Sequence, residues 1–114
     1  MDTQTTISQL KERVEAFVVE RDWTRFHTPK NLSMAITVEA AELMELFRWQ
    51  TETECTEFMR NVERRERAQD ELADVIILCL AFANRNGIDV ALSVEKKIRK
   101  NILKYPVAQF KGRV

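Results

Sequence analysis

The sequence contains few of the residues that interrupt helices. Only two Gly and two Pro occur among its 114 residues. A turn-rich β fold needs more of both, because Gly and Pro supply the backbone conformations of tight turns. With 45% hydrophobic and 32% charged residues, the composition favours long helices around a core. A chain of this length is expected to form a single domain over residues 1–114, with residues 1–4 and 107–114 as loose tails.

Histidine and cysteine are also scarce. His27 is the only histidine, which excludes the Glu-x-x-His pairs of di-iron bundles and His-rich zinc sites. Cys55 lies in a polar segment and Cys79 in the most apolar one, an unsuitable pair for a disulfide framework. We therefore expect reduced thiols in a cytoplasmic protein.

Net charge, long apolar runs and a phosphate loop are absent as well. Eighteen acidic and eighteen basic side chains balance, so we expect neither nucleic acid nor a membrane surface as a partner. The N-terminus has no basic start or apolar stretch, and the longest apolar run is far below the ~20 residues that span a bilayer. No Gly-rich phosphate loop occurs, so any phosphate must be bound in another way.

Two carboxylate pairs are the most informative feature that is present. Glu39 and Glu42 are three residues apart, and Glu71 and Asp74 repeat the spacing. Three residues is close to one helical turn, so each pair projects from one side of a helix. At about 100° per residue, Glu39 falls inside the apolar stripe of its helix and Glu42 at the stripe's edge, whereas Glu45 points to solvent.

The second pair lies in still more apolar surroundings, because the following residues 75–83 carry no charge. Carboxylates in such a place are costly unless a positive group meets them, and converging carboxylates raise one another's pKa. A hard divalent cation, Mg²⁺ or Mn²⁺, is the simplest partner for such oxygen ligands. The alternative is that each pair forms ordinary salt bridges at a helix surface.

Hydrophobic periodicity predicts an all-α fold with four main helices. We expect them at residues 5 or 6 to 22, 29 or 31 to 49, 65 to 86, and from just after Gly87 to Pro106, with a short helix near residues 54–62. The third helix is apolar on nearly all sides, and this apolar surface is larger than three neighbouring helices can cover. We therefore expect an antiparallel four-helix bundle that self-associates. The buried stripe of the fourth helix should contain Ala91, Val94, Ile98 and Tyr105.

Five stretches together resemble a known family. EAAE at residues 39–42, twenty-eight intervening residues and ELAD at 71–74 are similar to the ExxE…ExxD signature of the all-α nucleoside triphosphate pyrophosphohydrolases, the MazG-like and dCTP pyrophosphatase group. ERDWTRFHTPKNL, LFRWQ and KNILKYP match in the same order. The resemblance covers about residues 15–106 and implies Mg²⁺-dependent hydrolysis between the α and β phosphates by a homodimer or homotetramer, in a nucleotide-pool house-cleaning role.

The resemblance also implies roles for particular residues, each of which has an alternative. Lysines beside a buried stripe can simply extend their ammonium groups into water, His27 can satisfy a local hydrogen bond, and exposed tryptophans can cover a subunit interface. The implied catalytic and metal-binding residues are Glu39, Glu42, Glu71 and Asp74, with Glu42 or Glu39 orienting the attacking water; the phosphate-binding residues are Lys97, Asn101 and Lys104; the nucleoside-binding residues are Trp23, His27, Trp49 and Tyr105.

The substrate is expected to be a deoxynucleoside triphosphate, with dCTP the best single candidate. Some members of the resembled family carry a Tyr where this chain has Leu78, so we expect activity to extend to other bases. Two alternatives stay open. One is a dUTP-directed member of the same superfamily, and the other is a helical dimerisation module without catalysis, in which the acidic pairs bridge to Lys97 and Lys104.

Overall fold

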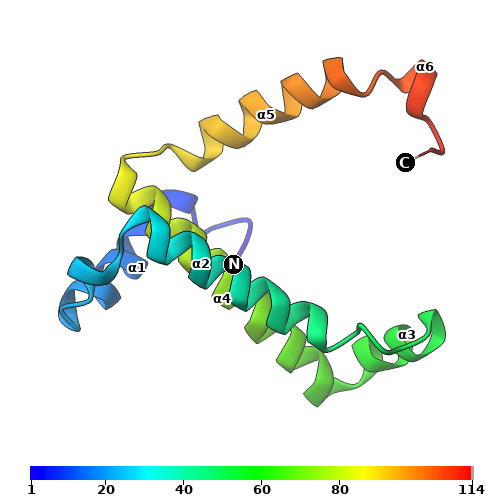
Figure 1. Ribbon diagram of the computed structural model, residues 1–114, viewed down its shortest axis with the longest axis horizontal. Helices are drawn as coiled ribbons and strands as arrows, with labels where there is room; N and C mark the ends of the chain where they lie inside the picture. Colours follow the sequence, from blue (N-terminus) through cyan, green and yellow to red (C-terminus); the bar gives the residue numbers. More distant parts are fainter. Residues whose placement is uncertain (114) are drawn as a thin grey trace.

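The computed structural model describes residues 1–113, which form helices joined by turns (Figure 1). The all-α prediction is confirmed. Val114, the last residue of the predicted C-terminal tail, lies outside the described residues. The elements in order are α1 (Ile7–Glu20), the 3₁₀ helix η1 (Thr24–Phe26), α2 (Pro29–Glu45), α3 (Glu52–Arg60), α4 (Val62–Asn86), α5 (Val90–Lys104) and α6 (Val107–Phe110).

The predicted start and stop signals operate as expected. The Thr6 side chain caps α1 in a capping box with Gln9. Thr28 caps α2, its hydroxyl accepting from the Asn31 N–H at 3.1 Å, and Pro29 occupies the first turn. Gly87 ends α4 in the left-handed conformation at φ 61°, where a side chain would be strained.

Helix boundaries differ from the prediction most at the end of α2 and at the start of α4. Helix α2 stops at Glu45 instead of residue 49, because the chain tightens into hydrogen-bonded turns in which the N–H groups of Phe47 and Arg48 both donate to the Met44 carbonyl. Helix α4 begins at Val62 instead of residue 65. Its start is set by Asn61, an extended residue whose side chain accepts from the Arg64 N–H at 3.0 Å.

The core lies where α1 and α2 pack against the C-terminal half of α4. Helices α2 and α4 run side by side in opposite directions, and α3 covers their far end (Figure 1). At that end, Phe58 is buried and meets Phe47 edge to face, with ring centroids 5.0 Å apart. The buried cluster between α1, α2 and α4 consists of Val14, Val18, Leu32, Leu80 and Ala81.

Helix α5 leaves this body and projects away from it (Figure 1). The expected apolar stripe on α5 is therefore exposed within the single chain, with Val94 at 51% and Ile98 at 53% exposure. None of the residues of Val90–Lys104 is buried. The radius of gyration, 17.1 Å, exceeds the value of about 13 Å typical of a compact chain of this size. One chain alone thus does not close a four-helix arrangement around α5.

No single helix within residues 1–113 is long and apolar enough to cross a membrane. Only α4 and α5 taken together, although bent by 104°, reach that length and composition.

Candidate active site

The antiparallel packing of α2 on α4 brings the predicted carboxylates together. Glu39 and Glu42 come from α2, and Glu71 comes from the facing turn of α4. One carboxylate oxygen from each of these three residues lies within 4.8 Å of the others. Two helices that pack over most of their length hold such a cluster rigidly. The structure thus brings together three of the four carboxylates that the sequence singles out, and Asp74 is not in this group.

The cluster is electrostatically unfavourable without a cation. Burial raises the pKa of Glu39 above its ordinary value, and the adjacent Glu42 carboxyl raises it further. Burial and then Glu42 raise the pKa of Glu71 in the same way. Asp74 is exposed at the edge of the cluster, yet its charge contributes to the raised pKa of both groups. The charges of Glu42 and Asp74 therefore act on both Glu39 and Glu71.

The cluster also contains unsatisfied oxygens. Oε2 of Glu39 and Oε2 of Glu71 are buried and have no hydrogen-bond partner. Buried acceptors of this kind are rare in native proteins unless an ion or water completes them. Oxygen-only donors suit Mg²⁺ or Mn²⁺, so the residues present fit a hard divalent cation.

The ion pairs of the chain lie elsewhere. Within residues 1–113 they join Arg21 with Glu20, Arg25 with Asp22, Arg48 with Glu45, and Arg99 with Glu95. The described residues thus do not form the ordinary salt bridges that were the alternative for the two acidic pairs. Glu45, assigned to solvent by its helical phase, is indeed exposed and pairs with Arg48 at 3.2 Å.

The predicted phosphate-binding residues are not brought to the carboxylates within one chain. Lys97, Asn101 and Lys104 lie on α5, which projects away from α2 and α4 (Figure 1). Lys97 and Lys104 are exposed, and Asn101 is half-buried. The ammonium group of Lys104 lies 5.3 Å from the centre of the Tyr105 ring, and that ring meets Phe110 edge to face.

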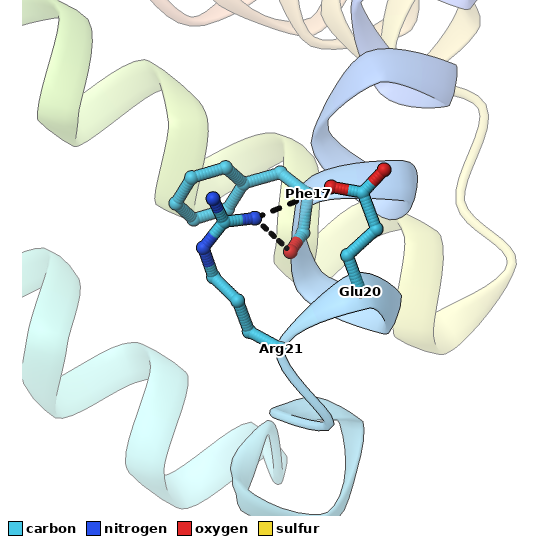
Figure 2. A network of polar contacts seen from close by, with 3 residues as sticks. All are labelled: Phe17, Glu20 and Arg21. Atoms are coloured by element: carbon cyan, nitrogen blue, oxygen red, sulfur yellow. Dashed lines mark hydrogen bonds and ion pairs between the residues drawn. The ribbon is translucent and has the colours of Figure 1, made fainter.

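Trp23 is held in place by the turn that follows α1. Its ring packs edge to face on Phe17, with centroids 5.6 Å apart. Arg21 folds back over the Phe17 ring at 3.8 Å and donates to the Phe17 carbonyl and to Glu20 (Figure 2). Asp22, at φ 54°, makes the reversal. Trp23 remains 44% exposed, so part of its ring is free to contact a ligand.

Trp49 and His27 are placed differently. Trp49 is 80% exposed, with the Arg48 guanidinium 4.4 Å from its ring centre. His27 is half-buried, and its Nδ1 is buried without a partner. Next to Trp49, Gln50 has a buried, unpartnered Oε1 that the sequence reasoning did not identify. Its position at the end of LFRWQ was the only available signal.

The fold is that of an all-α protein, and its acidic cluster between two antiparallel helices fits a divalent cation. Comparison places it more closely, because the model of the MazG-like family matches residues 34–113. The chain belongs to this family.

Named relatives and a solved structure agree. The chain is similar to dCTP pyrophosphatase 1 from Mus musculus, with 36% identity over 109 residues, 96% of this chain and 64% of that protein. The Homo sapiens protein of the same name is 37% identical over 103 residues, 90% and 61% of the two chains. A crystal structure of a pyrophosphatase from Archaeoglobus fulgidus superposes with a TM-score of 0.80 at 35% identity, covering 87% of this chain and 91% of that one. The chain spans a little under two thirds of the length of the two dCTP pyrophosphatases.

Proposed function

We propose that this chain is a Mg²⁺-dependent nucleoside triphosphate pyrophosphohydrolase that releases a nucleoside monophosphate and pyrophosphate. The observation that carries the proposal is the cluster of Glu39, Glu42 and Glu71, with its two buried oxygens that lack partners. The names of the relatives support the substrate class.

The four carboxylates would bind the metal, and one of them would also orient the attacking water. Glu39, Glu42, Glu71 and Asp74 would hold Mg²⁺, or Mn²⁺ in its place. When bound, the cation would neutralise these charges and polarise the phosphate oxygens. A free oxygen of Glu42 or Glu39 would accept a hydrogen bond from a water molecule and orient it toward the α-phosphorus. The water oxygen then bonds to that phosphorus, the bond to the bridging oxygen breaks, pyrophosphate leaves, and the carboxylate takes the proton.

Phosphate binding would require a second copy of the chain. Lys97, Asn101 and Lys104 suit a triphosphate, because they offer mobile positive charges and an amide, but α5 carries them away from the carboxylates of its own chain. The exposed stripe on α5 and an apolar groove of about 470 Å³ between α1 and α4 provide surfaces for self-association. In a homodimer or homotetramer, α5 of one copy would reach the carboxylates of the other.

The nucleoside would bind between exposed aromatic side chains. Trp23 and Trp49 offer stacking faces worth about 1 to 3 kcal/mol per base, with Tyr105 nearby in the assembled site. Stacking discriminates poorly between bases, so the half-buried His27 is the side chain that would form hydrogen bonds to a base edge. Deoxynucleoside triphosphates are the proposed class, and dCTP is the preferred member.

The proposed setting is the cytoplasm, where removal of unwanted nucleotides would protect the nucleotide pool. Free thiols at Cys55 and Cys79 suit such a reducing compartment. The balanced charge of the chain gives no reason to propose nucleic acid or a membrane as a partner.

A panel of the common ribo- and deoxyribonucleoside triphosphates, assayed for pyrophosphate release with and without Mg²⁺, tests this function. We expect metal-dependent cleavage that is fastest with dCTP. A clear preference for dUTP would indicate the dUTP-directed alternative. If no triphosphate is cleaved and Mg²⁺ does not change the melting temperature, the dimerisation module is the remaining alternative. The exposed apolar stripe on α5 would then be its interface.

A further inference from the structure

Two hydrogen bonds join the middle of α1 to the end of α4. The ammonium group of Lys11 donates to the Ile88 carbonyl at 2.8 Å, and the Asn84 side-chain amide donates to the Lys11 carbonyl at 2.9 Å. All three residues are half-buried. Every other side-chain hydrogen bond in residues 1–113 joins groups no more than six residues apart. These two are therefore the only ones that tie distant segments of the described chain.

The Ile88 carbonyl belongs to the short link that sets the direction of α5. Gly87 ends α4 in the left-handed conformation, and Asp89 caps α5. Helix α5 has no buried residue, and only Val90, at its first position, packs against the core cluster. An open cleft of about 750 Å³ separates the start of α1 from the link and the first residues of α5. The direction of α5 thus depends on the link and on the Val90 contact, and Lys11 is the side chain of another helix that hydrogen-bonds to the link.

We infer that Lys11, with Asn84, is a positioning residue that aims α5, and with it Lys97 and Asn101, at the phosphate subsite. This inference rests on the proposed function, because it assigns Lys97 and Asn101 to the triphosphate. A lysine suits the position, since its ammonium can reach a carbonyl just beyond the negative end of a helix. Glu12 and Glu15 line the same cleft and keep the surroundings favourable to a cation.

The kinetic test uses Lys11→Met, which keeps the apolar stem and removes the charged donor. We expect the KM for the best triphosphate to rise about fivefold or more, as for couplings between separated sites, while inhibition by the monophosphate product is unchanged. Lys11→Arg, which retains a cationic donor, should restore most of the loss. Asn84→Ala should reproduce the pattern of Lys11→Met. The matched control is Lys30→Met, an exposed lysine outside the link.

A double-mutant cycle identifies the route of the effect. If Lys11 acts through α5, Lys11→Met should change KM little once Lys97→Ala and Asn101→Ala are both present. Additive losses would overturn the inference, because Lys11 would then act independently of Lys97 and Asn101.

Hydrogen exchange of the ligand-free protein separates this inference from the proposed function. In Lys11→Met, amides of residues 88–94 should exchange faster, while those of α2 should not. If the wild type cleaves no triphosphate, the proposed function fails and the role of Lys11 at the phosphate subsite fails with it, although faster exchange would still show that Lys11 holds α5. Unchanged exchange together with unchanged KM would overturn the inference while leaving the proposed function intact.

Discussion

Glu39 and Glu71 oppose the folding of the metal-free chain. Each has a raised pKa because burial and neighbouring carboxylates disfavour its charged form, so at neutral pH each contributes a penalty. We expect Glu71→Gln to melt higher than the wild type in the presence of EDTA. The same variant should lose the stabilisation that Mg²⁺ gives the wild type, about 2.7 kcal/mol at a hundredfold excess over Kd, and should lose turnover by orders of magnitude. Thermal melts with and without Mg²⁺ check the first two outcomes.

Glu45→Gln is the matched control for that experiment. It removes a carboxylate from the same helix as Glu39, but one that is exposed and paired with Arg48. An exposed pair contributes at most about 1 kcal/mol, so activity and the Mg²⁺ response should be nearly unchanged. Damage equal to that of Glu71→Gln would contradict the assignment of the carboxylates by helical phase.

Trp49 lies on the surface without the support that Trp23 receives from Phe17. Its 80% exposure leaves a face for a base, so Trp49→Ala should raise the KM for the nucleoside triphosphate roughly tenfold, equivalent to about 1.4 kcal/mol of lost stacking. The oligomer equilibrium, measured by sedimentation, should shift much less. A large change in oligomeric state with an unchanged KM would assign this tryptophan to a subunit interface.

At the scale of the helix, Gly87 is the position to test, because it ends α4 and begins the turn to α5. Its φ is +61°, and an added Cβ would meet no atom within 4 Å. Gly87→Ala should therefore cost about 1 kcal/mol of unfolding free energy, from backbone strain alone, measurable by denaturant titration. Gly112→Ala, also at positive φ and without nearby atoms, serves as control. It lies in the terminal turn, where local fraying relieves strain, and should cost less. Equal losses would argue against a special role for the α4 cap.

Local signals in the sequence were sufficient to place most helices. Thr28-Pro29 and Gly87 mark helix ends through backbone chemistry that acts within a few residues, and the structure has those ends. The end of α2 was wrong because residues 46–49 contain no helix-breaking residue. There the chain tightens into turns beside the contact of Phe47 with Phe58, a tertiary influence that periodicity does not reveal.

The candidate site likewise has one part that the sequence predicts and one part that it does not. Glu39, Glu42 and Glu71 were predictable, because two helices with i, i+3 carboxylates that pack side by side must bring them together. The position of α5 was not. An apolar stripe indicates that a helix face will be covered, but it does not identify which surface covers it. The hydrogen bond between Lys11 and Ile88 joins residues that are 77 positions apart, so no local sequence pattern indicates it.

At the scale of the whole molecule, the exposed α5 makes self-association the central prediction. Ile98→Asp places a charge on the apolar stripe and should shift the protein toward monomer at tens of micromolar in sedimentation experiments. Lys96→Asp, on the opposite side of the same helix, should leave the assembly intact. A wild type that is already monomeric at that concentration would contradict the prediction.

If α5 of one copy completes the site of another, as proposed, the active site would be a shared property of two polypeptides. Two variants that are each defective in a different part of the site should then complement each other. In a mixed dimer of Glu71→Gln and Lys97→Ala subunits, one composite site contains both defects and the other contains neither. Refolding the two variants together in equal amounts should recover about a quarter of wild-type activity, since half of the randomly formed symmetric dimers are mixed and each has one intact site. Mixtures that are no more active than the average of the separate variants would mean that each chain supplies a whole site by itself.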